Sequence, residues 1–459
     1  MAIQPGDQPL EHVMFGLKYE GIDLALLQQV FKAIPAGDVA DIINAKPSSK
    51  YSRQIGFLYE FLTDEALEVN AISGNYVDLI DPADYVLPEG QKEQRWRVNN
   101  NLPGNASFCP LVRRTPVINK WLAVNFSTAI NNSISDVDPS IFARAVNYLY
   151  FKETKSSNDI EREVPSAKKE LLFVDLLKNA GRQSGKKSLS EDGLVNYQNI
   201  VTERRFNDER YRLNQNYVGE VSYYGRAPTV HLIGMPPQFV DKTMSGFAEF
   251  DALTAGMNPV VKATCLSFGF VFVHPFDDGN GRVHRFLFND VLAREGLLEQ
   301  GVILPVSAVM FKNMHDYNTA LETFSKPLMS AATFSRDQDD HLTVLNPESI
   351  AGYYVFPDLT CQTEYMFATV DLTINVELVN ELKIIQAMDS LRSDIKYIVD
   401  MPNKETELML KLLHQGNGSL SNTKRKLFNM LTEDEISLME SAYLEVFHSE
   451  EDDDGFGPR

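Results

Sequence analysis

Cysteine is scarce in this chain, and the cysteines present are not placed for a disulfide framework. Cys109, Cys265 and Cys361 are the only ones, and they are odd in number and far apart in the sequence. Small secreted proteins depend on paired cysteines, and zinc sites typically repeat a Cys-x-x-Cys spacing that is missing here. The cysteine usage therefore argues against a disulfide scaffold and a zinc site, and it favours a reducing compartment, the cytoplasm.

The sequence also lacks an excess of basic residues and a long hydrophobic segment. Its 43 Lys and Arg residues face 63 Asp and Glu residues, which gives a net charge of −20. General nucleic-acid binding needs a basic face, so we expect no nucleic-acid partner. The longest apolar run, 260–273, is too short to cross a bilayer, and the first residues lack the pattern of a signal peptide. We therefore expect a cytoplasmic protein without a membrane partner.

Apolar residues recur at helical spacing through much of the chain, which is 44% hydrophobic and of ordinary globular composition. Glycine punctuation with β-branched and aromatic residues predicts a hairpin at 215–234. Residues 182–205 are polar and contain glycine, and we expect a loop there. Loops with short extended pieces are expected at 70–115. Helices are predicted within 1–45 and at 52–62, 117–152, 168–177, 370–399 and 405–413.

One stretch, from His274 to Arg285, combines residues that carry chemistry. The apolar run before it reads as a buried helix that ends at His274, because a residue that precedes proline is disfavoured in the helical conformation. Asp277-Asp-Gly-Asn-Gly281 is predicted to form a tight turn. The helical pattern resumes at Arg282 and ends near Gly296. The chemical groups therefore lie in a glycine-rich loop between two buried helices.

The residue types in this loop favour phosphate chemistry. Backbone amides of a glycine-rich turn and of a helix N-terminus attract anions, and Arg282 and Arg285 add positive charge. Asp278 is a hard oxygen ligand suited to Mg²⁺, and His274 is placed to take a proton near neutral pH. An EF-hand and a Walker loop are excluded by their missing residues. Together these groups indicate phosphoryl or nucleotidyl transfer to a hydroxyl group.

The stretch resembles, at every defining position, the signature of Fic proteins (filamentation induced by cAMP), His-x-Phe-x-Asp/Glu-Gly-Asn-Gly-Arg-x-x-Arg. The matching residues are His274, Phe276, Asp278, Gly279, Asn280, Gly281, Arg282 and Arg285. Most Fic proteins transfer AMP from ATP to a Tyr, Thr or Ser hydroxyl of a target protein. The resemblance therefore implies a protein adenylyltransferase that uses ATP and Mg²⁺. It also implies an all-α Fic fold with a small β-hairpin flap, flanked by helical N- and C-terminal regions.

The resemblance also implies a role for individual residues. His274 is implied as the general base, Asp278 as the Mg²⁺ ligand and Phe276 as a core anchor of the loop. The implied nucleotide-binding residues are Gly279, Asn280, Gly281 and Arg282 around the α- and β-phosphates, Arg285 at the γ-phosphate, and Asn289 and Tyr317 near the nucleotide.

A second family feature precedes the signature. Many Fic proteins carry an inhibitory helix with the pattern Ser/Thr-x-x-x-Glu-Gly/Asn, whose glutamate pairs with the second signature arginine. Ser157 and Glu161 match this spacing, although Arg162 stands where Gly or Asn is usual. A carboxylate beside Arg285 would occupy the cation that the γ-phosphate needs and repel that phosphate. The resemblance therefore implies autoinhibition by Glu161. The alternative is an ordinary exposed glutamate on a charged helix.

The remaining regions complete the expected organisation. In Fic proteins a hairpin flap docks the target protein by strand addition, and 215–234 lies where this flap should be. The predicted regions are an N-terminal helical region at 1–119, a Fic core at 120–330 with its inhibitory helix near 154–163, a C-terminal helical domain at 331–448 and a disordered acidic tail at 449–459.

Other functions remain open at this point. Fic-type proteins can transfer a phosphate or another phosphate-containing group, and the same site can remove AMP from a modified protein with Glu161 positioning water. A different class would be a nucleotide-sensing interaction protein without catalysis. The intact His274, Asp278 and Arg285 argue against that class, because binding alone needs no base. The target protein is not identified by the sequence, and a homo-oligomer is left open.

Overall fold

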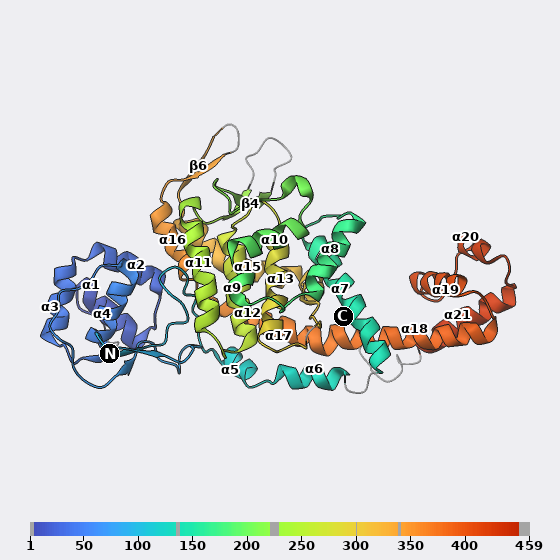
Figure 1. Ribbon diagram of the computed structural model, residues 1–459, viewed down its shortest axis with the longest axis horizontal. Coiled ribbons are helices and arrows are strands. Elements are labelled where there is room, and N and C mark those ends of the chain that lie inside the picture. Colours follow the sequence, from blue (N-terminus) through green and yellow to red (C-terminus); the bar gives the residue numbers. More distant parts are fainter. Residues whose placement is uncertain (1–3, 135–137, 221–228, 300, 338–340, 449–459) are drawn as a thin grey trace. The chain divides into compact units, whose positions relative to one another are not determined.

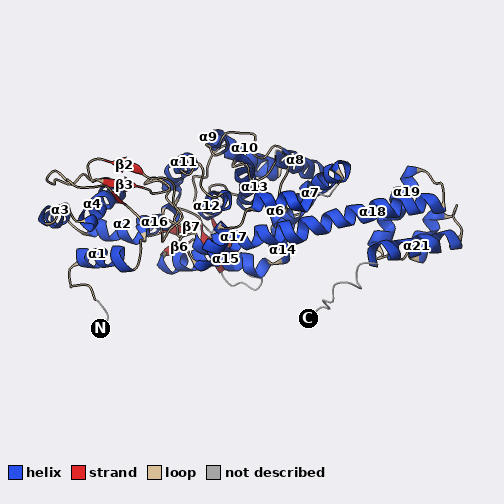
Figure 2. Ribbon diagram, turned by 90° about the horizontal axis from the view of Figure 1, so that it is seen from below, coloured by secondary structure: helices blue, strands red, loops and turns tan. Residues whose placement is uncertain are grey.

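The computed structural model describes residues 4–134, 138–220, 229–299, 301–337 and 341–448 (Figure 1). Helices make up most of the described chain, and the strands are short and form small sheets (Figure 2). The predicted helical fold class with a small hairpin is therefore confirmed. The acidic segment 449–459, predicted as a disordered tail, lies outside the described residues.

The N-terminal helices pack around a core that they share with the loop region after them and with Phe356. They are α1 (Pro9–Tyr19), α2 (Leu24–Ala33), α3 (Ala36–Ala45) and α4 (Lys50–Thr63). The aromatic residues of α4 contribute to this core, since Tyr59 is buried and packs edge-on against Phe31. Trp96 lies so close to Gly56 that a Cβ atom there would come within 2.0 Å of the ring. Position 56 therefore requires glycine.

The loop region that follows contains a small sheet. Strands β1 (Val77–Asp78), β3 (Val98–Asn100) and β2 (Gln91–Glu93) lie in that order, with β1 parallel and β2 antiparallel to β3. These strands are the short extended pieces that the composition predicts. Asn101 fastens the end of the sheet, because its amide group donates to the carbonyl of Ile80 at 2.8 Å and accepts from the Ile80 N–H.

The central helices surround the signature. In chain order the elements are α5 (Pro116–Leu122), α6 (Phe126–Ile134), α7 (Pro139–Ile160), α8 (Ala167–Lys178), α9 (Gly185–Ser188), α10 (Glu191–Val201), strands β4 (Tyr217–Glu220) and β5 (Thr229–Ile233), α11 (Pro237–Leu253), α12 (Pro259–Val273), α13 (Asn280–Arg294), α14 (Val306–Lys312) and α15 (Met314–Ala331). Helix α12 is apolar and buried along its length, and α13 packs against it (Figure 1). The predicted hairpin is present as antiparallel β4 and β5, while 221–228 lies outside the described residues.

The loop predicted at 182–205 is wrong, because most of this segment is helical. Ser190 caps α10 by accepting a hydrogen bond from the N–H of Gly193, and acidic residues occupy the first turn. The buried residues Leu194, Tyr197 and Val201 then follow at helical spacing. The polar composition concealed this capped helix.

The C-terminal elements begin with a short hairpin, β6 (Phe334–Arg336) and β7 (Leu342–Val344), and α16 (Pro347–Val355). Helix α17 (Thr360–Leu372) continues through a π-helical segment, Thr373–Leu378, into α18 (Val379–Ile398). The last helices are α19 (Asn403–Gln415), α20 (Asn422–Arg425) and α21 (Glu433–His448). Thr432 and Glu435 form reciprocal side chain to backbone hydrogen bonds that open α21.

By packing, the chain divides into two compact units. One comprises residues 1–129 and 149–373, and the other comprises 130–148 and 374–459. The boundaries of these packing units differ from those of the predicted regions 1–119, 120–330 and 331–448. The three predicted regions stay a prediction. Among the described residues, no helix combines the length and the apolar character that a membrane crossing requires.

Candidate active site

The signature loop connects the end of α12 to the start of α13. His274 caps α12 in the left-handed conformation, with φ of 54° and ψ of 59°. Gly279 is the N-cap of α13 with φ of 85°, so α13 begins at Asn280, earlier than the predicted Arg282. A Cβ atom at Gly279 would lie 2.6 Å from the Thr202 side chain. The loop therefore needs glycine here for both its conformation and its close approach to the segment after α10.

Side chains inside the loop fix its shape. Phe276 is fully buried and packs against Phe270 and Tyr211. The Asn280 side chain accepts a hydrogen bond from the Phe276 N–H at 3.0 Å and donates to the Phe276 carbonyl at 2.8 Å. Because both ends of the Asn280 amide are engaged within the loop, this side chain shapes the turn, and the first amides of α13 supply its anion-binding character.

His274 is held in the tautomer that a general base requires. Its Nδ1 lies 3.0 Å from the carbonyl oxygen of Val271. A carbonyl can only accept, so Nδ1 carries the proton and Nε2 has a free lone pair. Burial lowers the pKa of His274 to about 4, with a contribution from Arg212. The imidazole is therefore neutral at physiological pH and can accept a proton.

Arg285 is the most enclosed cation of the site. It is 1% exposed, and its Nε donates to the Ser157 hydroxyl at 2.9 Å. Its Nη2 donates to the Ser157 carbonyl at 2.9 Å and to the Glu161 carboxylate at 2.7 Å. Burial alone would lower the pKa of Arg285, but the charge of Glu161 raises it above its usual value. The two residues predicted for the inhibitory helix thus both contact the second signature arginine.

Glu161 follows the last residue of α7 and reaches the start of α13. One of its oxygens stands 2.1 Å from the place that a Cβ atom on Gly281 would occupy. Partial burial would raise the pKa of Glu161, but Arg285 lowers it below its usual value. An ionised carboxylate therefore lies over the first turn of α13, where the amides favour an anion.

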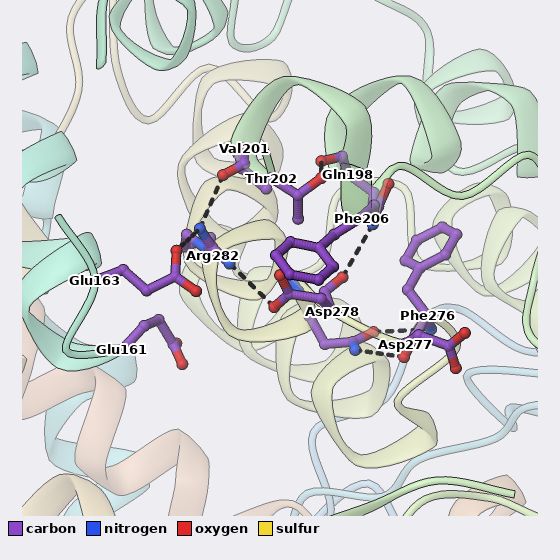
Figure 3. Close-up of polar contacts among 12 residues, drawn as sticks. Glu161, Glu163, Gln198, Val201, Thr202, Phe206, Phe276, Asp277, Asp278 and Arg282 are labelled. Atoms are coloured by element: carbon purple, nitrogen blue, oxygen red, sulfur yellow. Dashed lines mark hydrogen bonds and ion pairs between the residues drawn. The ribbon is translucent and has the colours of Figure 1, made fainter. Parts of the chain in front are cut away.

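Arg282 is paired with a carboxylate that the sequence reading did not single out. Its Nη1 donates to Glu163 at 2.6 Å and to the Val201 carbonyl at 2.9 Å, and its Nη2 donates to Asp278 at 3.1 Å (Figure 3). Arg282 is 2% exposed. The sequence offers little evidence for a role of Glu163, apart from its position two residues after Glu161.

The segment around α10 supports the loop from the other side. The Gln198 side chain donates to the Asp278 carbonyl at 3.2 Å and to the Phe206 carbonyl at 2.9 Å (Figure 3). The loop predicted at 182–205 assigns no role to Gln198, although this residue holds the signature. Its position on the buried face of an amphipathic helix is the signal that could have found it.

Asn289 and Tyr317 are buried to a similar degree as the signature arginines. Asn289 is 0% exposed, and its side-chain oxygen accepts from the N–H of Leu304 at 3.0 Å. Tyr317, on α15, is 3% exposed, and burial raises its pKa although Arg285 opposes this. Both side chains are interior, and their contact with a nucleotide stays a prediction.

The Mg²⁺ ion that the signature implies would depend on Asp278. Within the ranges that the structure describes, no group of at least three His, Cys, Asp or Glu side chains is arranged to hold a metal. The Asp278 side chain is 36% exposed, and it also accepts from the Gly279 N–H at 2.6 Å. Mg²⁺ commonly takes one or two carboxylates together with phosphate oxygens and water. Asp278 therefore fits the ion in combination with a bound nucleotide.

Comparisons with known proteins point to one family. The model of the Fic/DOC family matches residues 188–292. Protein adenylyltransferase fic-1 of Caenorhabditis briggsae is 31% identical over 113 residues, 24% of this chain and 20% of that relative. Protein adenylyltransferase Fic of Nematostella vectensis is 32% identical over 84 residues, 18% of each chain. The chain thus spans about a fifth of the length of these curated relatives.

Among solved structures, the chain is similar to a Fic family protein from Desulfovibrio desulfuricans G20. The sequence identity is 18%, the TM-score is 0.41, and the match covers 61% of this chain and 80% of that one.

Proposed function

The chain belongs to the Fic/DOC family through the domain at residues 188–292, and on that premise we propose that it is a protein adenylyltransferase. It transfers AMP from ATP to a hydroxyl group of a target protein. The observation that carries this proposal is the neutral His274, whose Nε2 is free to accept a proton beside the anion-attracting start of α13. A base and a phosphate site in one loop are what nucleotidyl transfer to a hydroxyl needs.

The reaction follows from these positions. Nε2 of His274 takes the proton of the target hydroxyl while the oxygen of that hydroxyl attacks the α-phosphorus of ATP. A new oxygen–phosphorus bond forms, the bond between the α-phosphorus and the bridging oxygen breaks, and pyrophosphate leaves. Arg282, Arg285 and the first amides of α13 stabilise the negative charge of the leaving group. A bound Mg²⁺ would supply further neutralisation of the phosphates at Asp278.

We also propose that the protein inhibits itself through Glu161. The Glu161 carboxylate occupies Arg285, which the γ-phosphate would otherwise reach, and it lies over Gly281 at the mouth of the phosphate site. A bound triphosphate would meet a fixed negative charge there, so ATP binds weakly or with its α-phosphate misplaced. The target protein docks on the hairpin of β4 and β5, which lies upstream of the signature.

The test compares the parent protein with Glu161→Gly, incubated with ATP labelled at the α-phosphate, Mg²⁺ and cell lysate. A hydrogen bond to a charged group contributes about 1.5–3 kcal/mol, so we expect incorporation of label to rise about ten- to a hundredfold. Glu161→Gln serves as a second variant, because it removes the charge and keeps the size of the side chain.

The control is Glu161→Gly combined with His274→Ala, which should lose about 10²–10⁴-fold in rate. Mass spectrometry of the labelled protein identifies the group that is transferred. Equal incorporation by the parent and Glu161→Gly would refute autoinhibition. An adduct mass that differs from AMP would replace adenylyl transfer by the transfer of another phosphate-containing group. ATP binding without any transfer would favour a nucleotide-sensing protein.

A further inference from the structure

Arg212, which neither the signature nor the inhibitory helix includes, is buried directly beneath the catalytic loop. It lies just before β4 and is 5% exposed. Among the described residues, no carboxylate lies within ion-pairing distance of its guanidinium group. Burying a cation without an ionic partner is costly unless its N–H groups are satisfied by well-placed acceptors.

The acceptors of Arg212 are backbone carbonyls from separate parts of the fold. Its Nε donates to the His274 carbonyl at 2.7 Å, and its Nη1 donates to Asn214 at 2.7 Å. Its Nη2 donates to the carbonyls of Met235 and Val273. The backbone N–H of Arg212 adds a bond to the Pro275 carbonyl at 2.9 Å. One side chain thus satisfies acceptors on either side of the hairpin and at the end of α12.

These acceptors explain why a cation is stable at this position. Val273 and His274 end α12, and the last carbonyls of a helix lack helical partners and carry partial negative charge. A guanidinium group presents several N–H donors in a fixed plane, whereas an ammonium group is a point charge. Arginine therefore suits this cluster of spread carbonyls, and lysine does not.

The same bonds determine where the imidazole lies. His274 has a left-handed backbone, a conformation that costs about 1–2 kcal/mol for a residue with a side chain. Arg212 holds the carbonyl of this residue, and Asn216 supports the next turn through its bond to the Phe276 carbonyl at 2.9 Å. With the peptide fixed, Nδ1 of His274 remains on Val271 and Nε2 keeps its direction.

We propose that Arg212 is a positioning residue that fixes the general base His274 and ties its loop to both ends of the β4–β5 hairpin. A target segment docked on the hairpin is then presented to a base in a fixed position. This inference rests on the proposed adenylyltransferase function. It predicts a loss in kcat with little change in the KM for ATP, because none of the Arg212 bonds involve Arg282, Arg285 or the first turn of α13.

The proposal also predicts a change in pH dependence. The charged groups that act on His274 are Arg212, which lowers its pKa, and Glu161 and Asp278, which raise it. Removing the cation at position 212 therefore raises the pKa of His274 towards its usual value. The base is then protonated at a higher pH, so activity at pH 5–6 falls more than activity at pH 8.

The experiment uses Arg212→Lys and Arg212→Met in the full chain carrying Glu161→Gly. Arg294→Lys is the matched control, because Arg294 is also a buried arginine, 8% exposed in its side chain, but it pairs with Asp251 and Asp290 away from the loop. A misplacement of about 1 Å can cost about 100-fold, so we expect kcat to fall about 10- to 100-fold in the Arg212 variants. The KM for ATP stays within about twofold of that of the Glu161→Gly protein.

NMR titration of the His274 ring provides a readout that needs no activity. We expect its pKa to rise in Arg212→Met, which removes the positive charge, and to stay unchanged in Arg294→Lys. A kcat loss no larger than that of Arg294→Lys, or an unchanged titration of His274 in Arg212→Met, would overturn the proposal. If the Glu161→Gly protein transfers no AMP, the proposed function fails, while the titration still decides whether the charge of Arg212 acts on the histidine.

Discussion

At the scale of single residues, the turn after α7 places two carboxylates on the two signature arginines. Glu161 pairs with Arg285 at 2.7 Å, and Glu163 pairs with Arg282 at 2.6 Å. The family pattern concerns the first pair alone. The second pair occupies the arginine expected to contact the α- and β-phosphates, so release of Glu161 would free only part of the phosphate site.

We therefore predict that Glu163→Gln strengthens ATP binding when Glu161 has already been replaced. The Glu163 side chain is 42% exposed, and solvent screening limits such pairs to about 0.2–1 kcal/mol. The KM for ATP should fall about 1.4- to fivefold in Glu161→Gly with Glu163→Gln, compared with Glu161→Gly alone. Steady-state kinetics at low salt measure the change, and Glu322→Gln on α15 is the control. An unchanged or higher KM would show that Glu163 does not compete with the phosphates.

The signature residues were predictable because they form one contiguous string with fixed spacing. Glu163, Gln198 and Arg212 were not, because each acts through contacts with residues far away in the sequence. Arg212 bonds with backbone carbonyls, and a carbonyl leaves no trace in the identity of its residue. Only the folded arrangement of α12 and the hairpin shows which arginine donates a hydrogen bond to the His274 carbonyl.

At the scale of elements, the end of α7 determines where both carboxylates point. Arg162, between them, has a positive φ of 57°. Its N–H donates to the Asp159 carbonyl at 3.0 Å, and the Glu163 N–H donates to the Asn158 carbonyl at 3.0 Å. A left-handed residue directly after a helix is usually Gly or Asn. This geometry gives a physical reason for the Gly or Asn that the family pattern places here, and arginine keeps the turn at some cost in strain.

We therefore predict that Arg162→Gly stabilises the protein and deepens its inhibition. Glycine removes the strain of the left-handed backbone, which contributes about 1–2 kcal/mol to the free energy of unfolding. The greater flexibility of glycine in the unfolded chain offsets about 0.5–1 kcal/mol of this gain. The net gain is up to about 1.5 kcal/mol in the free energy of unfolding. Chemical denaturation measures the gain, and AMP transfer without any Glu161 substitution should decrease. Arg162→Ala, which keeps the strain, is the control. Higher basal transfer in Arg162→Gly would contradict this account of the turn.

Strongly patterned elements were the predictable part of the fold. The apolar α12, the aromatic face of α4 and the capped α21 each carry a local signal. Helix α10 was missed because its polar exposed face dominates its composition. The single helix predicted at 370–399 is interrupted by the π-helical segment Thr373–Leu378. That insertion shifts the buried face, and such a shift depends on tertiary packing.

At the scale of the whole molecule, the two packing units have separate apolar interiors. The core of the second unit joins α18, α19 and α21 through Leu391, Leu413, Met439 and their neighbours. The signature lies entirely in the first unit, in the loop after α12 and in the first turns of α13. Helix α7 contributes residues to both units, since its first residues belong to one and Ser157 to the other.

Because the two units have separate cores, we predict that a core substitution destabilises only the unit that contains it. Met439 on α21 and Met244 on α11 are 0% and 1% exposed, one in each unit. A buried Met→Ala substitution costs about 2–5 kcal/mol. In hydrogen exchange monitored by mass spectrometry, Met439→Ala should speed exchange in α18, α19 and α21, while peptides from α12 and α13 keep their protection. Met244→Ala should give the reverse pattern. AMP transfer by Glu161→Gly should survive Met439→Ala, because His274 and its phosphate site draw on the other core. Equal acceleration across both units by either variant would instead mean that the chain unfolds as one cooperative body.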